Sequence, residues 1–176
     1  NLTTAILEPH TSPAKTEATS AAAYVAPPTL IRLPNGVRVI IRSDKSAPTV
    51  SIVAMGLGGV RLEPAKEAGV SHMMTEMLTR GTQRRNAEQI AQVVDDLGGS
   101  LAGFSGYNSW GMQSQWLAAD WRKGLTLVAE SMLTPNFPDS ELSRVRAQTL
   151  SALDAQSEDP MTRAALLLRS TFYGAH

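Results

Sequence analysis

Apolar side chains recur every three to four residues in the stretch 68–82, which is the spacing of one face of an α-helix. Polar residues fill the other side. Two of them, His72 and Glu76, stand four positions apart, so they can point to one spot. Gly81 follows the last apolar position, where a left-handed C-terminal cap is expected. The pattern predicts an amphipathic helix that presents a polar pair. Its apolar positions are Val70, Met73, Met74, Met77 and Leu78.

The same period predicts four more helices. The first begins at Asn86, a good N-cap with Gln89 three residues later, and ends at Gly98. The four cover residues 86–97, 119–133, 139–157 and 161–173. Their expected buried positions are Ile90, Val93, Val94 and Leu97, then Trp121, Leu125, Val128 and Met132, then Leu142, Val145, Thr149, Leu150 and Leu153.

Alternation of β-branched and other residues predicts strands in the remaining stretches. Two strands lie on either side of Pro34-Asn35-Gly36, which is a hairpin signal. Three more cover residues 48–57, 100–105 and 109–116. The resulting order is three strands, two helices, two strands and three helices. This order predicts an α+β domain in which a mostly antiparallel sheet is covered by helices.

The composition argues against several classes of function. Sixteen basic and sixteen acidic residues give no net charge, and no basic run indicates a nucleic-acid partner. No apolar run reaches the roughly 20 residues of a membrane span. The lack of cysteine excludes disulfides and thiolate ligands and leaves the compartment, periplasm or cytoplasm, open. Gly56, Gly58 and Gly59 do not complete a phosphate-binding loop and instead indicate a strand-to-helix turn.

Other polar and aromatic groups favour structural roles. Asp95-Asp96 and Glu158-Asp159 lie at predicted helix ends, where solvated capping regions are commoner than acid–base dyads. The three tryptophans indicate core or domain contacts rather than a binding surface.

The helix at 68–82 resembles the metal helix of the M16 peptidases (pitrilysin, insulysin and mitochondrial processing peptidase), a family of inverted-motif zinc enzymes. Members carry H-x-x-E-H between Ala-Gly and Gly-Thr, and this chain has Ala68-Gly69 and Gly81-Thr82 at those flanks. The resemblance covers residues 29–176. It implies the M16 (LuxS/MPP-like) metallohydrolase fold, incomplete at its C-terminus. Further matching segments are Gly98-Gly99-Ser100, Pro135-Asn136-Phe137 and the long helix at Glu141.

The first 28 residues differ from the rest in composition. Residues 1–7 have the pattern of a strand, and the following residues to 28 are rich in Ala, Thr, Ser and Pro, which is typical of a linker. M16 domains tend to end in a similar strand. The resemblance therefore implies the end of a preceding domain plus a linker over 1–28. An ordinary disordered terminus is the alternative.

Within the M16 frame, this chain departs from the zinc-site pattern at most positions. His72 matches the first zinc histidine, Thr75 stands at the general-base glutamate, and Glu76 stands at the second histidine. Family spacing places the third ligand, a glutamate, at Ala152 and another acidic residue at Val145. A catalytic zinc needs three protein ligands, and its water needs a base. The resemblance therefore implies that the chain has no catalytic and no metal-binding residues of its own.

M16 enzymes consist of homologous domains that close around a chamber for unfolded peptides, and domains without zinc complete its wall. The resemblance implies such a non-catalytic domain or subunit, in a homo- or hetero-oligomer with a catalytic M16 partner that carries the zinc. Two alternatives stay open. One is a metalloendopeptidase in which His72 and Glu76 recruit a further ligand. The other is a peptide-binding interaction module without proteolysis.

Peptide binding in the family resembles β-augmentation, in which the substrate adds a strand to the edge of a sheet. The matching segment here is Ala102-Gly103-Phe104. Active members have an Asn-Ala pair at this place, and Ala102 departs from that pattern. We also expect the sheet to lack a terminal strand, so that the chain associates through an open edge or an uncovered apolar patch.

Overall fold

The computed structural model describes residues 27–174. The strand expected at 1–7 and nearly all of the expected linker lie outside the described residues. The chain divides into two units, Asn1–Ala47 and Pro48–His176. The domain boundary expected at residue 28 stays a prediction.

The described part of the first unit is the predicted hairpin. Its strands are β1 (Thr29–Arg32) and β2 (Arg38–Ile41), which pair antiparallel with Thr29 opposite Ile41. The turn between them depends on Asn35 and Gly36. The Asn35 side chain accepts a hydrogen bond from the Val37 amide at 3.1 Å, and Gly36 has a φ of +88°. The Asn-Gly signal is confirmed.

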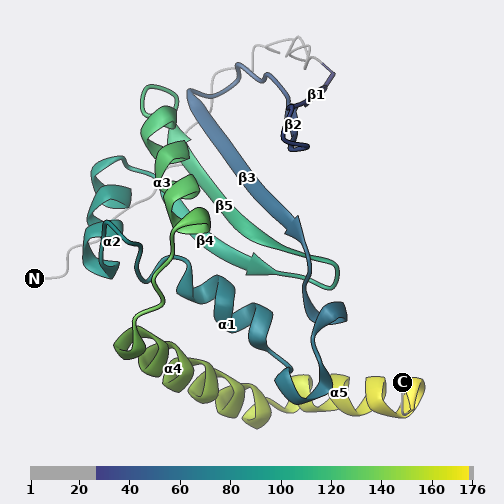
Figure 1. The fold of residues 1–176 in the computed structure, drawn as a ribbon. Coiled ribbons are helices and arrows are strands. Elements are labelled where there is room, and N and C mark those ends of the chain that lie inside the picture. Colours follow the sequence, from purple (N-terminus) through teal and green to yellow (C-terminus); the bar gives the residue numbers. More distant parts are fainter. Residues whose placement is uncertain (1–26, 175–176) are drawn as a thin grey trace, which may run out of the picture. The chain divides into compact units, whose positions relative to one another are not determined.

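The second unit is built on a three-stranded antiparallel sheet (Figure 1). The order across it is β3-β5-β4, so β5 is central and β4 is an edge strand of this sheet. The predicted strands are confirmed, the last of them one residue longer than expected. Their bounds are β3 (Thr49–Leu57), β4 (Ser100–Ser105) and β5 (Ser109–Leu117).

Helices cover one face of this sheet. Burial alternates along β5, where Met112, Ser114 and Trp116 are buried and the residues between them are exposed. Helix α1 packs on β4, α2 on β4, and α3 on β5 and β3. Helix α4 packs on α1, and α5 continues from the end of α4 (Figure 1). The helices are α1 (Val70–Met77), α2 (Ala87–Asp96), α3 (Trp121–Leu133), α4 (Asp139–Glu158) and α5 (Pro160–Tyr173). Two short 3₁₀ turns, η1 (Val60–Leu62) and η2 (Ala65–Glu67), precede α1.

The core lies between the sheet and these helices. One cluster surrounds Trp116, which is 1% exposed, and a second surrounds Met112. The α+β architecture with a helix-covered antiparallel sheet is therefore confirmed. The buried members of the two clusters are Ile90, Leu97, Trp116 and Leu127, then Leu78, Met112 and Val128.

The predicted C-terminal cap of α1 was wrong. The helix stops at Met77, and Gly81 does not have a positive φ. Gly81 is needed for close approach instead, because a Cβ there would lie 2.4 Å from the Asn136 side chain. The left-handed glycine is at the other end of the helix, where Gly69 has a φ of +94° at the N-cap.

Two predicted helix faces also need correction. On α3 the prediction is confirmed for Val128, at 1% exposure, but Leu125 is 42% exposed and Leu127, which was not predicted, is buried against Trp116. On α4 only Val145 is buried and Thr149 is half-buried, because α1 covers a narrow stripe of this helix. The other expected core residues of α4, Leu142, Leu150 and Leu153, are exposed.

The capping box of α2 is confirmed. Asn86 accepts from the Gln89 amide at 2.8 Å, and the Gln89 side chain accepts from the Asn86 amide at 3.0 Å. Asp159 begins α5, where its carboxylate accepts from the Thr162 amide at 2.8 Å. Among the described residues, no helix combines the length and apolar character needed to cross a bilayer.

Candidate functional site

The N-terminus of α1 is held by a carboxylate from the preceding turn. Oε2 of Glu63 accepts from the Gly69 amide at 2.7 Å, and Oε1 accepts from the Ser71 amide at 2.9 Å. These bonds, that of Gly69 first, hold the pKa of Glu63 below its usual value. The carboxylate therefore caps orphan donors of the helix. The sequence analysis missed Glu63, because a cap from outside the usual N-cap position has no fixed spacing.

Helix α1 approaches β4 very closely at one glycine. A Cβ on Gly103 would lie 2.1 Å from the carbonyl oxygen of Thr75. Thr75 is 1% exposed, and its hydroxyl donates to the carbonyl of His72 at 3.0 Å. Thr75, which stands at the position of the family's general base, is therefore buried between the helix and the sheet, and its side chain is hydrogen-bonded to its own helix.

His72 and Glu76 lie on the outer part of α1. His72 is exposed and Glu76 is half-buried. Neither side chain forms an ion pair with another residue of the described range. The i, i+4 spacing places them on one side of the helix, as predicted.

Helix α1 packs against α4, the helix on which the family pattern places the third ligand. The Thr149 hydroxyl lies 3.7 Å from the Met73 sulfur. Val145 is 2% exposed in this contact, whereas Ala152, one turn after Thr149, is exposed. The residue at the family's third ligand position therefore lies on the helix that packs against α1, but it ends in a methyl group.

These residues do not fit a catalytic zinc ion. The three positions offer an imidazole (His72), a carboxylate (Glu76) and a methyl group (Ala152). Within residues 27–174, no three His, Cys, Asp or Glu side chains gather in one place. Three protein ligands are the rule for catalytic zinc. We therefore derive no chemical step through a metal on this chain.

The segment expected to bind peptide lies on the edge strand. Ala102 is exposed, while Gly103 and Phe104 are half-buried. Because side chains alternate along a strand, Ala102 and Phe104 face the sheet side opposite the helices, and Gly103 faces α1. The structure thus brings the predicted peptide strand and the helix of His72 and Glu76 side by side, through the contact of Gly103 with Thr75.

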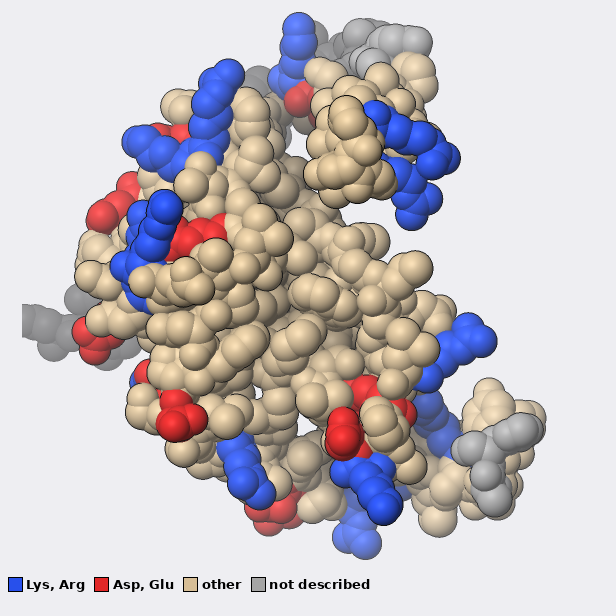
Figure 2. All heavy atoms as spheres, in the orientation of Figure 1, with Lys and Arg blue, Asp and Glu red and all other residues tan. Residues whose placement is uncertain are grey.

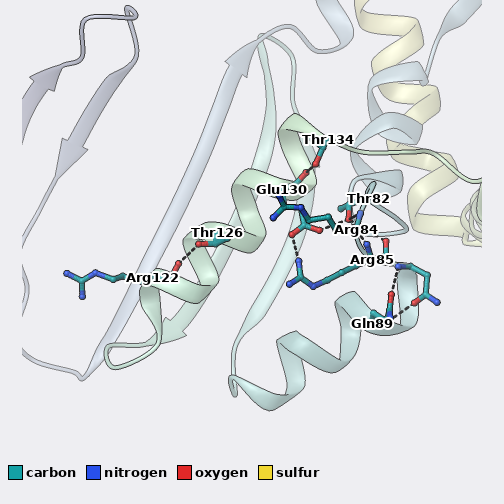
Figure 3. A network of polar contacts seen from close by, with 9 residues as sticks. Thr82, Arg84, Arg85, Gln89, Arg122, Thr126, Glu130 and Thr134 are labelled. Atoms are coloured by element: carbon teal, nitrogen blue, oxygen red, sulfur yellow. Dashed lines mark hydrogen bonds and ion pairs between the residues drawn. The ribbon is translucent and has the colours of Figure 1, made fainter.

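A buried ion pair fixes the loop after α1 (Figure 3). The carboxylate of Glu130 on α3 accepts from the Thr82 hydroxyl at 2.6 Å and pairs with the Arg85 guanidinium. Its side chain is 6% exposed. Burial alone would raise the pKa of Glu130, but the bonds from Thr82 and Arg85 outweigh it and hold that pKa below the usual value. Thr82 also accepts from the amides of Arg84 and Arg85.

This network is a structural anchor. The same loop is tied to the segment after α3 by backbone bonds, from Gln83 to Thr134 and from Asn136 to Gly81. The sequence analysis did not identify Glu130. One signal could have found it, because an acidic residue stands in the buried register of Leu127, Val128 and Ser131.

An open depression of about 820 Å³ lies at the other end of the sheet, between the β4–β5 turn and α5. Arg169 Nη2 lies 3.4 Å from the Tyr107 hydroxyl there. Tyr107 and Tyr173, on its walls, are 68% and 61% exposed. The depression is therefore a loosely walled surface feature.

Comparison with known families gives one family for most of the chain. The profile of the insulinase family, peptidase family M16, matches residues 38–176. An uncharacterized zinc protease of Mycobacterium tuberculosis is 28% identical over 165 residues, covering 93% of this chain and 37% of that protein. A probable mitochondrial-processing peptidase subunit beta of Arabidopsis thaliana is 26% identical over 65% of this chain and 22% of that protein.

Solved structures agree in fold. The structure of a peptidase M16 inactive domain from Pseudomonas fluorescens superposes with a TM-score of 0.75 at 25% identity, over 86% of this chain and 37% of that one. A protease from Helicobacter pylori gives 0.70 at 19% identity, over 78% and 33% of the two chains, and shows the fold alone. The present chain thus spans about a third of the length of these proteins.

Proposed function

Because this chain belongs to the insulinase family, peptidase family M16, we propose that it is a non-catalytic M16-like domain. In this proposal it helps to form a chamber in which a catalytic M16 domain or subunit degrades unfolded peptides. The zinc ion belongs to that partner.

The observation that carries the proposal is the state of α1. The helix keeps the Ala-Gly and Gly-Thr flanks of the family motif, packs on β4 and faces α4. At the base position, Thr75 is buried and its hydroxyl is bonded to the His72 carbonyl. A hydroxyl has no basicity near neutral pH that could take a proton from water. The scaffold of the site is therefore retained while the groups that would cleave a peptide are replaced.

Retention of the scaffold supports a binding role. Gly103 lets α1 approach the edge strand, and β4 has no neighbouring strand on its outer side within the Pro48–Gly174 sheet. The unpaired backbone groups of such an edge can receive an extended peptide. The Pseudomonas fluorescens neighbour is itself described as an inactive domain, which favours this role over a rearranged metalloenzyme.

The test is metal analysis together with a peptidase assay on the purified chain. We expect no stoichiometric zinc after dialysis against zinc-containing buffer, and no cleavage of an unfolded peptide. One tightly bound zinc per chain with chelator-sensitive cleavage would overturn the proposal. It would support the alternative in which His72 and Glu76 recruit a further ligand.

A further inference from the structure

We infer that the β4 edge selects peptide segments that are uncharged and carry apolar side chains at alternate positions. The inference rests on the proposed function and adds the class of peptide. Its physical basis is the face of the sheet that the helices leave open.

The three strands of this sheet contain no charged residue. Neither β3, β4 nor β5 has an Asp, Glu, Lys, Arg or His. In the view of Figure 2 the middle of the Pro48–Gly174 unit is tan, and its charged side chains lie mostly toward the left and lower parts. A charged peptide side chain placed on this sheet would lose water without gaining a partner. Uncharged segments are therefore favoured.

One apolar row crosses the open face and ends at the β4 edge. The register places Met55 opposite Gly111 and Gly111 opposite Phe104. A Cβ on Gly111 would lie 3.0 Å from Cζ of Phe104, so the ring lies over this glycine. Met55 is 63% exposed and Phe104 is half-buried. A strand added at β4 would continue this row with its own side chain beside Phe104.

The other face of the edge imposes a different environment. Gly103 faces α1, and the carbonyl of Thr75 fills the space where its side chain would be. Peptide residues opposite Gly103 therefore face α1, the helix of His72 and Glu76. A peptide residue opposite Phe104 continues the apolar row, and one opposite Ala102 continues the uncharged row of Ala102, Gln113 and Val53. Directly opposed residues on neighbouring strands share a face. Charged residues should therefore be disfavoured at every second position of the peptide, and the apolar preference should be strongest at the position beside Phe104.

The inference is tested with fluorescein-labelled peptides of threonine and serine that carry leucine, glutamate or lysine at every second position. Fluorescence anisotropy should show that the leucine peptide binds about tenfold more tightly than the other two peptides. This ratio is expected because the leucine side chains form favourable cross-strand pairs and no charge has to be buried. A leucine peptide with every backbone nitrogen methylated should lose binding, because neither of its two edges keeps the N–H groups that would pair with β4.

Substitutions in the chain test which residue causes the preference for the leucine peptide. Phe104→Ser should bring the affinities for the leucine and glutamate peptides to within about threefold of each other, and Phe104→Leu should retain the preference. Val53→Ser is the matched control, because Val53 is 56% exposed on the same face but belongs to β3, the far edge of the sheet. It should leave the preference unchanged. A thermal melt of each variant confirms folding.

The outcomes separate the inference from the function on which it rests. If methylation abolishes binding but the glutamate peptide binds as well as the leucine peptide, the selectivity is wrong and edge binding stands. If methylated and unmethylated peptides bind equally, or none binds, peptide pairing at the β4 edge and its selectivity are both overturned, whereas the non-catalytic role is decided by the zinc analysis and the peptidase assay. Sedimentation that shows two copies paired through β4, with the peptide excluded, would also overturn the inference and assign this edge to a second chain.

Discussion

At the scale of residues, the hydroxyl of Thr75 donates a hydrogen bond to a carbonyl of its own helix. The position of the general base in the M16 pattern therefore holds a hydroxyl that is already bonded. The sequence identified Thr75, Glu76 and Ala152 as departures from the M16 pattern. It did not indicate that Thr75 is buried while Ala152 is exposed. The burial of Thr75 depends on how closely Gly103 lets α1 approach β4, and the exposure of Ala152 depends on how much of α4 is covered by α1. Neither tertiary contact is encoded in a local pattern.

Glu130 gives a prediction at the same scale. The pKa of this carboxyl is lowered in the folded protein, so its ionised form stabilises the fold above the unfolded value of about 4.3. That contribution is lost as the pH falls through the lowered folded pKa. Glu130→Gln keeps the shape but removes the charged partner of Arg85. We expect a loss of about 2 kcal/mol at neutral pH, and a smaller loss in acid.

Urea denaturation of both proteins between neutral pH and about pH 3 measures this difference. Glu88→Gln is a suitable control, because Glu88 is exposed in the first turn of α2. A Glu130→Gln variant whose stability ran parallel to the parent protein at every pH would contradict the assignment of the buried ion pair.

At the scale of elements, the order of helices and strands could be predicted because each has a clear local signal. The Asn86 capping box and the Asn35-Gly36 turn specify their own geometry. The faces of α3 and α4 were less predictable. Leucines recur on α4 with a helical period, yet Leu150 and Leu153 are each 54% exposed. A periodic pattern indicates a helix but does not name its partner.

The contact of α1 with α4 leads to a second prediction. Because Thr149 touches Met73, the third ligand position at Ala152 lies on the correct helix. Thr75→Glu, Glu76→His and Ala152→Glu together should create zinc affinity, since they supply the missing base and two ligands beside His72. Glu76→His alone leaves one ligand too few and should bind zinc far more weakly.

Isothermal titration with zinc compares the triple variant, the single variant and the parent chain. A melting temperature that rises with zinc only in the triple variant is the expected result. If the triple variant folds and binds no zinc, the two helices do not face each other in the way the M16 pattern requires.

At the scale of the whole molecule, helices cover one face of the β3-β5-β4 sheet, and the other face carries exposed Val53, Met55 and Leu57. The sequence predicted the layers but not which face stays open, because alternation along β3 is apolar on both sides. The chain also spans about a third of its relatives. Exposed apolar area on this scale favours association with a further domain or subunit.

We propose that this chain lacks peptidase activity itself and acts beside a catalytic M16 partner. The most direct measurement is cleavage of an unfolded fluorogenic peptide by a chain with an intact H-x-x-E-H motif from the same source, with and without the present chain. We predict that the present chain alone cleaves nothing, and that adding it raises kcat/KM of the partner in a saturable way. Cleavage by the present chain alone, or a partner whose rate is unchanged by it, would contradict the account.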